Sequence, residues 1–332
     1  MNRVLIAGAS GYAGALAAKL VQGHPNLELA RITARTDAGK RLDELYPEHG
    51  VALVLEEPSA EDGSDIDAAI VAYPHAAAAP VVASLRRQGV KVVDLSADFR
   101  LHDLDAYGRW YGEHGAPELV GEAVYGLTEL HRDRIGSADL VANPGCYPTA
   151  SLLALAPLAA AGLIDDVVID AKSGVSGAGR AAAEEMQAVK DSEDTRPYKV
   201  TGHRHSPEIA QELAELSGDG ADLTFVPHLL PYDQGELVSC YVRTSETLDA
   251  GRLLSLYEER YSDEPFVELA SDPPGVSGVR ETNLCRIHVA LDEASGRAMS
   301  FAAIDNLWKG AASQAVQNLN LMLGLPEGEG IS

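Results

Sequence analysis

The first 145 residues alternate short apolar runs with segments of helical periodicity. The apolar runs predict buried strands at 3–7, 27–32, 68–72, 91–95 and 139–142. The amphipathic segments between them predict helices at 12–22, 75–87 and about 129–135. Strands that alternate with helices in this way are typical of the α/β class, and here indicate a Rossmann-type, doubly wound parallel sheet.

The pattern changes in the second half, where apolar and polar positions alternate along longer segments. These segments predict strands at 167–171, 223–227, 236–244, 283–291 and 297–304. Helices are predicted at 207–216 and 248–261, with a hairpin turn at 292–296 and a final helix at 306–323. This half therefore predicts an α+β domain with a mostly antiparallel sheet.

Composition then excludes several classes of partner. The 332 residues carry 50 acidic against 26 basic side chains, a net charge of -24, which disfavours binding to nucleic acid or to an anionic membrane surface. No apolar run reaches the ~18 residues that cross a bilayer, and the chain starts in a strand pattern with no signal peptide. We expect a cytoplasmic protein whose acidic surface keeps it soluble.

A glycine-rich loop follows the first predicted strand and opens the first helix. Gly8, Gly11 and Gly14 are spaced as a variant of the dinucleotide-binding fingerprint, in which bare backbone approaches a pyrophosphate at a helix N-terminus. Ser10 and Tyr12 belong to the same loop and are candidate cofactor contacts. The alternative is a turn with a structural role only.

The end of the second strand distinguishes NAD from NADP. NAD sites place an Asp or Glu there to bind the ribose 2′-hydroxyl. This chain instead has Thr33, Arg35 and Thr36, with no carboxylate before Asp37. A guanidinium and two hydroxyl groups suit a 2′-phosphate, so the segment predicts NADP, used as NADPH. The alternative for Arg35 is a solvated loop charge.

The three cysteines are too widely spaced for a disulfide framework or a paired-cysteine zinc site. Cys240 and Cys285 lie in strand-like runs and are expected to be buried and inert. Cys146, in Asn-Pro-Gly-Cys-Tyr-Pro-Thr, stands after two strand breakers, at or just before the N-terminus of a helix predicted over 149–160. Helix N-termini favour thiolate, so Cys146 is the candidate nucleophile; the alternative is a buried cysteine at a domain junction.

This heptapeptide, residues 143–149, resembles the N-acetyl-γ-glutamyl-phosphate reductases of arginine biosynthesis, a family of the semialdehyde dehydrogenase superfamily. The likeness covers nearly the whole chain. The other matching segments are residues 8–14, 94–100, 123–127, 173–180, 203–209 and 305–312. Aspartate-semialdehyde dehydrogenases share the architecture, but they typically have Asn where this chain has Gly145 and lack the His-Arg-His-x-Pro-Glu-Ile run.

The resemblance implies an NADPH-dependent oxidoreductase that converts N-acetyl-L-glutamyl 5-phosphate to the 5-semialdehyde and phosphate. The Cys146 thiolate would attack the acyl phosphate and form a thioester, and hydride from NADPH would give a thiohemiacetal that collapses to the aldehyde. Two other functions stay open. One is reduction of an aminoadipyl or carrier-linked glutamyl phosphate, and the other is a non-catalytic NADP-sensing module on the same fold.

Collapse of a thiohemiacetal requires a base with a pKa near neutrality, the range of histidine. The resemblance assigns this role to His205, which precedes a predicted helix with Ser206 as its natural N-cap. Glu208 would orient or charge-stabilise the imidazole. His203 is the local alternative for the base. Because no third ligand lies near the two histidines, we expect no metal.

The implied substrate carries a phosphate and a carboxylate, so it requires two anion sites. By resemblance Arg100 faces the phosphate; a surface ion pair is its alternative. Arg180 ends a glycine-rich segment and is the candidate for the carboxylate, with ordinary surface charge as its alternative. Asn143, three residues before the nucleophile, is a further substrate-binding candidate.

Three more residues are candidates for cofactor contacts. Ser176 and Gly177 lie in the glycine-rich segment, and Asn306 resembles the family residue near the nicotinamide amide. We therefore expect an NADP-binding domain from residues 1–145 plus 305–325. Residues 146–304 should form a catalytic and oligomerisation domain of a homo-oligomer, dimer or tetramer, and residues 326–332 should fray.

Overall fold

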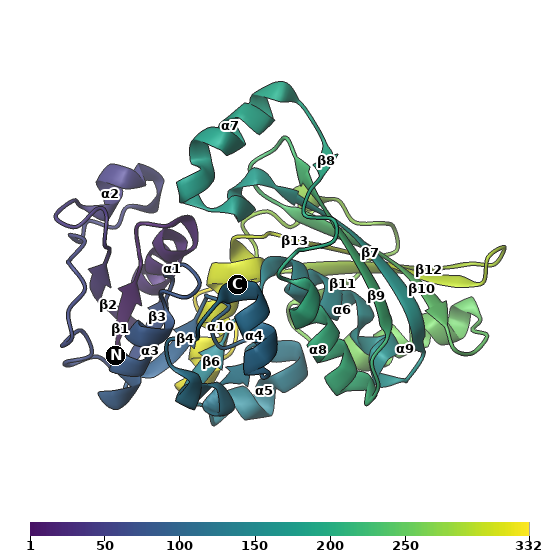
Figure 1. Cartoon of the computed structure of the whole chain (residues 1–332), viewed down its shortest axis with the longest axis horizontal. Helices are drawn as coiled ribbons and strands as arrows, with labels where there is room; N and C mark the ends of the chain where they lie inside the picture. Colours follow the sequence, from purple (N-terminus) through teal and green to yellow (C-terminus); the bar gives the residue numbers. More distant parts are fainter. Residues whose placement is uncertain (332) are drawn as a thin grey trace. The chain divides into compact units, whose positions relative to one another are not determined.

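The computed structural model describes residues 1–331 and contains two compact units (Figure 1). Unit 1 comprises residues 1–145 together with the chain from Ala311 onward, and unit 2 comprises Cys146–Gly310. The proposed functional domains, with limits at 145/146 and 304/305, stay a prediction.

Unit 1 is built on a six-stranded parallel sheet with the strand order β2-β1-β3-β4-β6-β5. Its strands are β1 (Asn2–Ala7), β2 (Leu27–Thr33), β3 (Ala68–Val71), β4 (Lys91–Asp94), β5 (Val124–Tyr125) and β6 (Leu140–Ala142). Val4, Leu5 and Ile6 of β1 have no exposed surface, as expected for a strand covered on both faces. The predicted Rossmann-type sheet is confirmed.

Among residues 1–331, six α-helices belong to unit 1. They are α1 (Tyr12–Gly23), α2 (Leu42–Leu45), α3 (Ala79–Arg87), α4 (Leu104–Tyr111), α5 (Thr128–Gly136) and α10 (Ser313–Met322). Helix α3 begins four residues later than the predicted residue 75. The reason is the buried Asp98 carboxylate, which accepts hydrogen bonds from the backbone amides of Ala76 (2.7 Å) and Ala79 (2.9 Å) and holds a turn in front of the helix.

Residues 326–331 pack against the rest of unit 1, in contrast to the fraying predicted for residues 326–332. Arg132 bonds to the Glu327 carboxylate at 2.8 Å, and the Asn320 amide donates to the carbonyl oxygens of Glu327 and Glu329. Ile331 is 5% exposed. These partners lie on α5 and α10, so the tail's local composition could not reveal them. Residue 332 lies outside the described residues.

Unit 2 contains a seven-stranded mixed sheet with the order β11-β12-β13-β10-β7-β9-β8. The strands are β7 (Ile164–Gly174), β8 (Arg196–Pro197), β9 (Asp222–Leu230), β10 (Glu236–Thr244), β11 (Val267–Leu269), β12 (Cys285–Asp292) and β13 (Arg297–Ile304). β7 pairs in parallel with β9, and β11 with β12, whereas the other four pairings are antiparallel. The predicted mostly antiparallel sheet is confirmed.

The helices of unit 2 are α6 (Cys146–Ala160), α7 (Ala183–Ser192), α8 (Ser206–Ser217) and α9 (Ala250–Tyr261). Helices α6, α8 and α9 pack against strands of this sheet, whereas α7 packs against the residues that follow β7. Along β10 the residues Val238, Cys240 and Val242 are fully buried, while Leu237 and Tyr241, which point to the other face, are half-buried. Burial thus alternates with a period of two along β10, which indicates that one face of the sheet is covered and the other is less covered.

Helix α6 continues through a proline. Pro157 has no N–H, so the Leu153 carbonyl loses its helical partner. The Tyr261 hydroxyl of α9 donates to this carbonyl at 2.5 Å, and the Tyr257 hydroxyl donates to Ala154 at 2.6 Å. The two tyrosines therefore fix α9 against α6 and compensate for the interrupted ladder.

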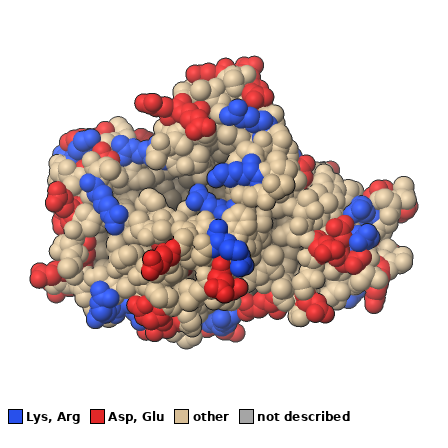
Figure 2. All heavy atoms as spheres, in the orientation of Figure 1, with Lys and Arg blue, Asp and Glu red and all other residues tan. Residues whose placement is uncertain are grey.

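The acidic excess lies largely at the surface. Figure 2 shows acidic side chains spread over the visible face, with a group in the α7 region, where Glu184, Glu185 and Asp191 are exposed. Within residues 1–331, no helix combines the length and apolar character needed to cross a membrane.

Candidate active site

Cys146 is the first residue of α6 and is partly exposed. The predicted location at a helix start is therefore confirmed, although the helix begins three residues before the predicted residue 149. Gly310 lies directly against the cysteine, since a Cβ added at position 310 would be 2.8 Å from the Cys146 Cβ. Only glycine fits there without displacing the thiol-bearing residue. Cys240 and Cys285 are fully buried, as expected.

Glu236, which the sequence reasoning missed, lies beside the nucleophile. It opens β10 and is fully buried near Cys146, and neither of its carboxyl oxygens has a hydrogen-bond partner among residues 1–331. Burial raises the pKa of Glu236 to about 8, although the nearby Cys146 thiol opposes the shift. A glutamate on the same face of the strand as Val238, Cys240 and Val242 was the available signal.

The two candidate histidines lie together around Tyr147, the residue after the nucleophile. The imidazole centroids of His203 and His205 are 4.8 Å apart, and their distances to the Tyr147 ring are 5.6 and 5.8 Å. Burial, with smaller effects from the charges of Lys199 and Arg204, lowers the pKa of His203 to about 4. His203 is consequently a weak base at neutral pH, which favours His205.

The start of α8 differs from the prediction in one detail. His205, not Ser206, occupies the N-cap position, and no side chain caps the helix. The backbone N–H of His205 donates to Nδ1 of His203 at 3.2 Å, which fixes the two residues relative to each other. Glu208 lies in the first turn of the helix and is 1% exposed, so its role in orienting His205 stays a prediction.

Asn306 connects the segments that the sequence singled out in unit 2. Its Oδ1 accepts from the Gly235 amide at 2.7 Å, and its Nδ2 donates to the Ser176 hydroxyl at 2.9 Å. A Cβ at Gly177 would lie 3.2 Å from the Ser173 hydroxyl, so the loop is close-packed. The structure brings Asn306 and Ser176 together, and the contact holds the glycine-rich segment against the start of β10.

The two candidate arginines have different surroundings. Arg180 is half-buried and begins a short 3-10 helix after Gly179, whose φ is +80°. Arg100 is 4% exposed, and its guanidinium donates to the carbonyl oxygens of Asn143 and Leu95, both at 2.8 Å. Arg100 is therefore held at the carboxyl ends of β4 and β6, the edge at which open α/β sheets bind ligands.

The side chain of Asn143 makes hydrogen bonds to other residues of unit 1. Its Nδ2 donates to the Ala311 carbonyl at 3.2 Å, and its Oδ1 accepts from Asn318 of α10 at 3.0 Å. Asn143 has no exposed surface. These contacts support a structural role, while substrate binding by Asn143 stays a prediction.

The glycine loop has the geometry of a phosphate cradle. Gly8 has a φ of +92°, and a Cβ there would lie 2.8 Å from the Ala72 backbone. A Cβ at Gly14 would collide with the Gly8 carbonyl oxygen, so helix α1 packs directly on the loop. Gly11 occupies the N-cap position of α1 without a side-chain cap, and Tyr46 bonds to the Ser10 carbonyl at 2.8 Å. The helix start is thus open to an anionic ligand.

Three residues after or at the end of β2 were predicted to bind the 2′-phosphate. Two of them, Arg35 and Thr36, are exposed, and Thr33 is buried. Arg35 is exposed, and its Cζ lies 4.9 Å from the ring centroid of Tyr73. Thr36 is also exposed, and its hydroxyl bonds to Asp37 at 3.4 Å. Thr33 is fully buried and shares a 3.1 Å hydrogen bond with the Tyr73 hydroxyl. Tyr73, missed in the sequence, therefore supports the strand end and the guanidinium together.

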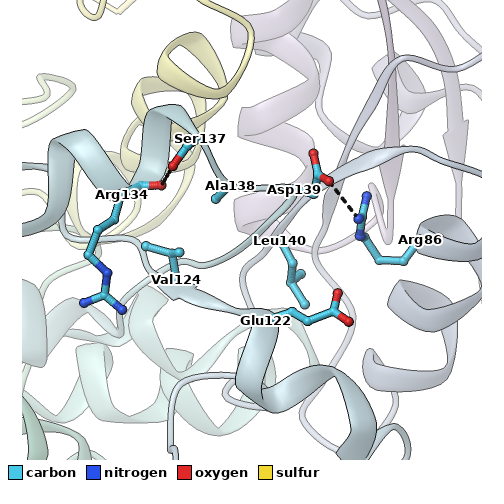
Figure 3. Close-up of a pocket in the computed structure, with 8 residues that line it drawn as sticks. All are labelled: Arg86, Glu122, Val124, Arg134, Ser137, Ala138, Asp139 and Leu140. Carbon is cyan, nitrogen blue, oxygen red and sulfur yellow. Dashed lines mark hydrogen bonds and ion pairs between the residues drawn. The ribbon is translucent and has the colours of Figure 1, made fainter.

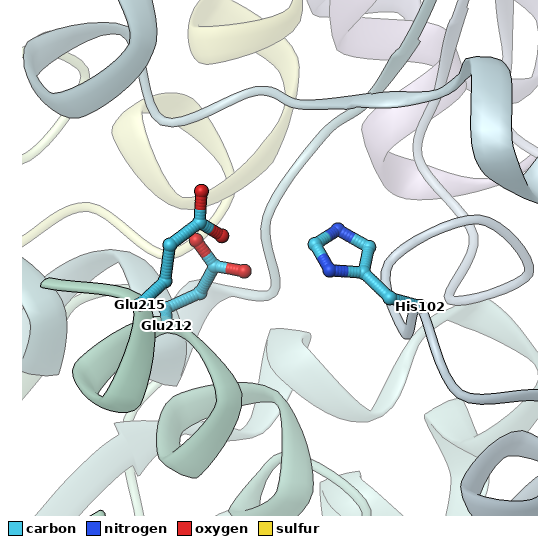
Figure 4. A group of neighbouring side chains, drawn as sticks. All are labelled: His102, Glu212 and Glu215. Atoms are coloured by element: carbon cyan, nitrogen blue, oxygen red, sulfur yellow. The ribbon is translucent and has the colours of Figure 1, made fainter. Parts of the chain in front are cut away.

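Two other features are weaker site candidates. A cavity of about 360 Å³ in unit 1 is lined by Asp139, Leu140 and Arg86, where Arg86 and Asp139 form an ion pair at 3.2 Å (Figure 3). It lies at the start of β6, away from the ligand-binding strand ends. On α8, Glu212 is buried and Glu215 is exposed, and their carboxylates lie side by side (Figure 4).

Comparisons with family models divide the chain in two. Residues 3–138 match the model described as "Semialdehyde dehydrogenase, NAD binding domain". Residues 146–306 match "Semialdehyde dehydrogenase, dimerisation domain". The chain thus contains a nicotinamide-cofactor domain of this superfamily.

Curated relatives extend the match to the full length. An N-acetyl-gamma-glutamyl-phosphate reductase of Geobacter sp. (strain M21) is 44% identical, with 100% of this chain and 98% of the relative covered. The enzyme of the same name from Alkalilimnicola ehrlichii is 46% identical, again with 100% and 98% covered.

Solved structures show the same fold at lower identity. Aspartate semialdehyde dehydrogenase II of Vibrio cholerae gives a TM-score of 0.76 at 19% identity, covering 97% of this chain and 98% of the other. The aspartate semialdehyde dehydrogenase of Candida albicans, solved with NADP, gives 0.71 at 14% identity, with 97% and 98% covered.

Proposed function

Since the chain belongs to the N-acetyl-gamma-glutamyl-phosphate reductase family, we propose that it reduces N-acetyl-L-glutamyl 5-phosphate to N-acetyl-L-glutamate 5-semialdehyde and phosphate, a step of arginine biosynthesis. The observation that carries the proposal is the group of residues at the start of α6. A partly exposed Cys146 begins the helix, and two imidazoles stand around the adjacent Tyr147. This combination provides a nucleophile and a base.

Cys146 is the nucleophile of the proposed reaction. The first amides of α6 have no helical acceptor, and their partial positive charge stabilises thiolate at the first residue. The thiolate attacks the acyl carbon, the bond to phosphate breaks, and a thioester remains on sulfur. After reduction, the carbon–sulfur bond breaks and the aldehyde leaves.

His205 is the acid–base group for the substrate oxygen. It protonates that oxygen as the thiohemiacetal forms and removes the proton as the aldehyde is released. His203 supports it by accepting the His205 backbone N–H, and its low pKa keeps it neutral in this position. Glu208 would stabilise the charged imidazole.

Arginines provide the anion sites. Arg100 would bind the phosphate group, because its guanidinium is fixed by two carbonyl oxygens and forms bidentate bonds with oxyanions. Arg180 would bind the α-carboxylate of the substrate from the glycine-rich segment. A lysine would not reproduce the forked geometry at either position.

NADPH is the proposed cofactor, and it supplies the hydride. The loop of Gly8, Gly11 and Gly14 fits a pyrophosphate because two of its three glycines have no room for a Cβ and the helix start has no side-chain cap. Arg35, held over Tyr73, would bind the 2′-phosphate together with Thr36. Asn306 and Ser176 would line the nicotinamide end of the site.

The open face of the second sheet supports a homo-oligomer. Leu237, Tyr241 and Phe301 are half-buried there, and apolar side chains of this kind gather at subunit interfaces. We expect a dimer or tetramer. Light scattering coupled to size-exclusion chromatography measures the mass, and a monomer at micromolar concentration would contradict this part of the proposal.

The substrate assignment is tested in the oxidative direction. The purified protein is given phosphate, NADP⁺ and either N-acetyl-glutamate semialdehyde or the same semialdehyde without the acetyl group, and NADPH formation is followed by absorbance. We expect turnover with the acetylated compound only. Preference for an aminoadipate semialdehyde or a carrier-linked substrate would replace the assignment, and no turnover with any of them would indicate a cofactor-binding protein without this activity.

A further inference from the structure

Arg280 is an arginine of unit 2 for which the proposed reaction has no role so far. It follows a short 3-10 helix, Val276–Gly278, and is exposed. Its Nε donates to the carbonyl oxygen of Gln234 at 2.8 Å, and its Cζ lies 5.6 Å from the ring centroid of Tyr232. A backbone carbonyl and an aromatic ring therefore hold the guanidinium in place, and its two Nη groups remain for another acceptor.

The positive charge of Arg280 is not balanced by an acidic group within residues 1–331, where its guanidinium forms no ion pair with a carboxylate. Other arginines of unit 2 do form such pairs: Arg243 with Asp165, Arg252 with Glu259, Arg286 with Glu268, and Arg297 with Asp166. In a chain with 50 acidic and 26 basic side chains, an arginine that is held in place and unpaired is suited to an anionic ligand.

Asp305 connects the segment of Arg280 with the nucleophile. Asp305 is fully buried, and its carboxylate accepts from the backbone N–H of Glu281, the residue after Arg280, at 2.7 Å. Its carbonyl oxygen accepts from the Gly310 N–H at 2.9 Å, and Gly310 lies against Cys146. One buried residue therefore bonds both to the segment that carries Arg280 and to the residue that packs on the nucleophile.

The turn of residues 232–235 makes a second connection. Arg280 donates to one of its carbonyl oxygens. The glycine-rich segment 173–180 donates to two more, through the backbone N–H groups of residues 175 and 176, at 2.8 and 2.9 Å. This segment ends in Arg180, the proposed contact of the substrate's α-carboxylate. Both arginine-bearing segments are therefore held by the same turn.

We propose that Arg280 is a second binding group for the α-carboxylate of the substrate, and that it makes the enzyme specific for substrates that carry this carboxylate. The inference rests on the proposed function, since it takes N-acetyl-L-glutamyl 5-phosphate and its semialdehyde as the substrates. A guanidinium forms two parallel hydrogen bonds with a carboxylate, and the two Nη groups of Arg280 supply them.

The position of Arg280 fits the far end of the substrate. A few carbon atoms separate the reacting acyl carbon from the α-carboxylate, so the binding group for the carboxylate must lie near the nucleophile without touching it. The phosphate is attached directly to the reacting carbon, so its binding group must lie beside the sulfur. The connection between Arg280 and Cys146 runs through intervening residues, which favours the carboxylate over the phosphate as the anion.

The experiment compares two aldehydes in the oxidative direction, with phosphate and NADP⁺. One is N-acetyl-glutamate semialdehyde, and the other is 4-acetamidobutanal, which is the same molecule without the α-carboxylate. Arg280→Ala should lower kcat/KM about 10-fold to 100-fold for the first aldehyde, because hydrogen bonds between charged groups are lost, and leave the second unchanged. Arg280→Lys should restore only part of the loss, since an ammonium group lacks the forked geometry.

Arg243→Ala is the matched control. Arg243 is also exposed, but it pairs with Asp165 and lies at the end of β10 opposite the turn of residues 232–235. This variant should use both aldehydes as the wild type does. Three results for Arg280→Ala would overturn the proposal: an equal loss with the two aldehydes, a higher KM for phosphate in place of a higher KM for the aldehyde, or wild-type kinetics with both.

A second measurement covers the case in which 4-acetamidobutanal reacts too slowly to be followed. N-acetyl-L-norvaline keeps the α-carboxylate and lacks the aldehyde, so it competes with the substrate without reacting. Its inhibition constant should rise about 10-fold in Arg280→Ala and stay unchanged in Arg243→Ala. An inhibition constant that is the same in the wild type and in both variants would contradict the inference.

The proposed function is tested separately by the turnover of N-acetyl-glutamate semialdehyde in the wild type. No turnover would remove both the function and the role of Arg280. An active wild type together with an Arg280→Ala variant of unchanged kinetics would remove only the role of Arg280. The two failures are therefore distinguishable.

Discussion

Two helices of this protein begin directly after a strand of the parallel sheet, and their first residues differ in kind. Helix α1 begins after Gly11, and no side chain caps its first amides. Helix α6 begins with Cys146, whose sulfur lies at the positive end of the helix. The first amides of a helix have no acceptor within the helix, and their partial positive charge favours a negative charge nearby. The start of α1 suits the negative charge of a ligand that binds reversibly, and the start of α6 suits a negative charge on a side chain of the protein itself.

The largest expected effect comes from removing the charge at α6. Cys146→Ser should lower kcat/KM by about 10⁴-fold or more, because a hydroxyl does not ionise at neutral pH without a strong base. Binding of NADPH, measured by fluorescence titration, should stay within about twofold of wild type, since α1 is unchanged. Near-normal turnover would remove the contrast between the two helix starts.

The next effect concerns the base that serves the reaction at α6. His205→Asn should lower kcat by about 10²-fold to 10⁴-fold with little change in KM, because the imidazole acts in the transition state. His203→Asn is the matched variant and should cost less, since burial holds the pKa of His203 near 4. Steady-state kinetics of both variants decide the assignment, and the reverse order would transfer the role to His203.

A smaller effect is expected from moving the sulfur without changing it. Gly310→Ala places a Cβ 2.8 Å from the Cys146 Cβ, so the cysteine or the helix start must shift. Such overpacking costs about 1–3 kcal/mol, and a displaced nucleophile should lower kcat by about 10-fold to 100-fold. Gly202→Ala, at a position with no atom within 4 Å of an added Cβ, is the control and should be near normal. Equal kinetics in the two variants would show that the close contact is unimportant.

The smallest effect is expected for a change in the proposed binding site of NADPH. Arg35→Ala should weaken NADPH binding by about tenfold and leave NADH almost unchanged, because the guanidinium is exposed and its charge is partly screened. Arg31→Ala, at a half-buried arginine of β2 paired with Glu56 at 3.4 Å, is the control. The measurement is kcat/KM for both cofactors. A loss that is equal for NADPH and NADH would show that Arg35 does not bind the 2′-phosphate.

Much of the fold could be predicted from local pattern. The strands at 236–244 and 297–304 have the predicted limits, and α8 and α9 differ by at most two residues at either end. The short elements α2, α4, β5, β8 and β11 were not predicted. A segment of two to eight residues has too little periodicity of its own, and its conformation depends on what packs against it.

The parts of the candidate site that depend on local backbone geometry could be predicted from the sequence. The glycine spacing and the Pro-Gly-Cys turn determine backbone geometry within a few residues, so the sequence predicted the tight turn at Gly8, Gly11 and Gly14 and the position of Cys146 at a helix start. The strand end at Thr33 was also located correctly. However, its hydroxyl bonds to Tyr73, a partner on another strand-to-helix connection that no local pattern could identify.

The sequence by itself determined the two kinds of domain, the cradle at α1 and the cysteine at the start of α6, because hydrophobic period, glycine and proline act over neighbouring residues. Tertiary structure alone decided the partners of the polar side chains. It brought Glu236 near Cys146 and joined Asn306 to Ser176. Such pairs form between strands and helices distant in sequence, and their geometry depends on sheet order and register, which no single segment encodes.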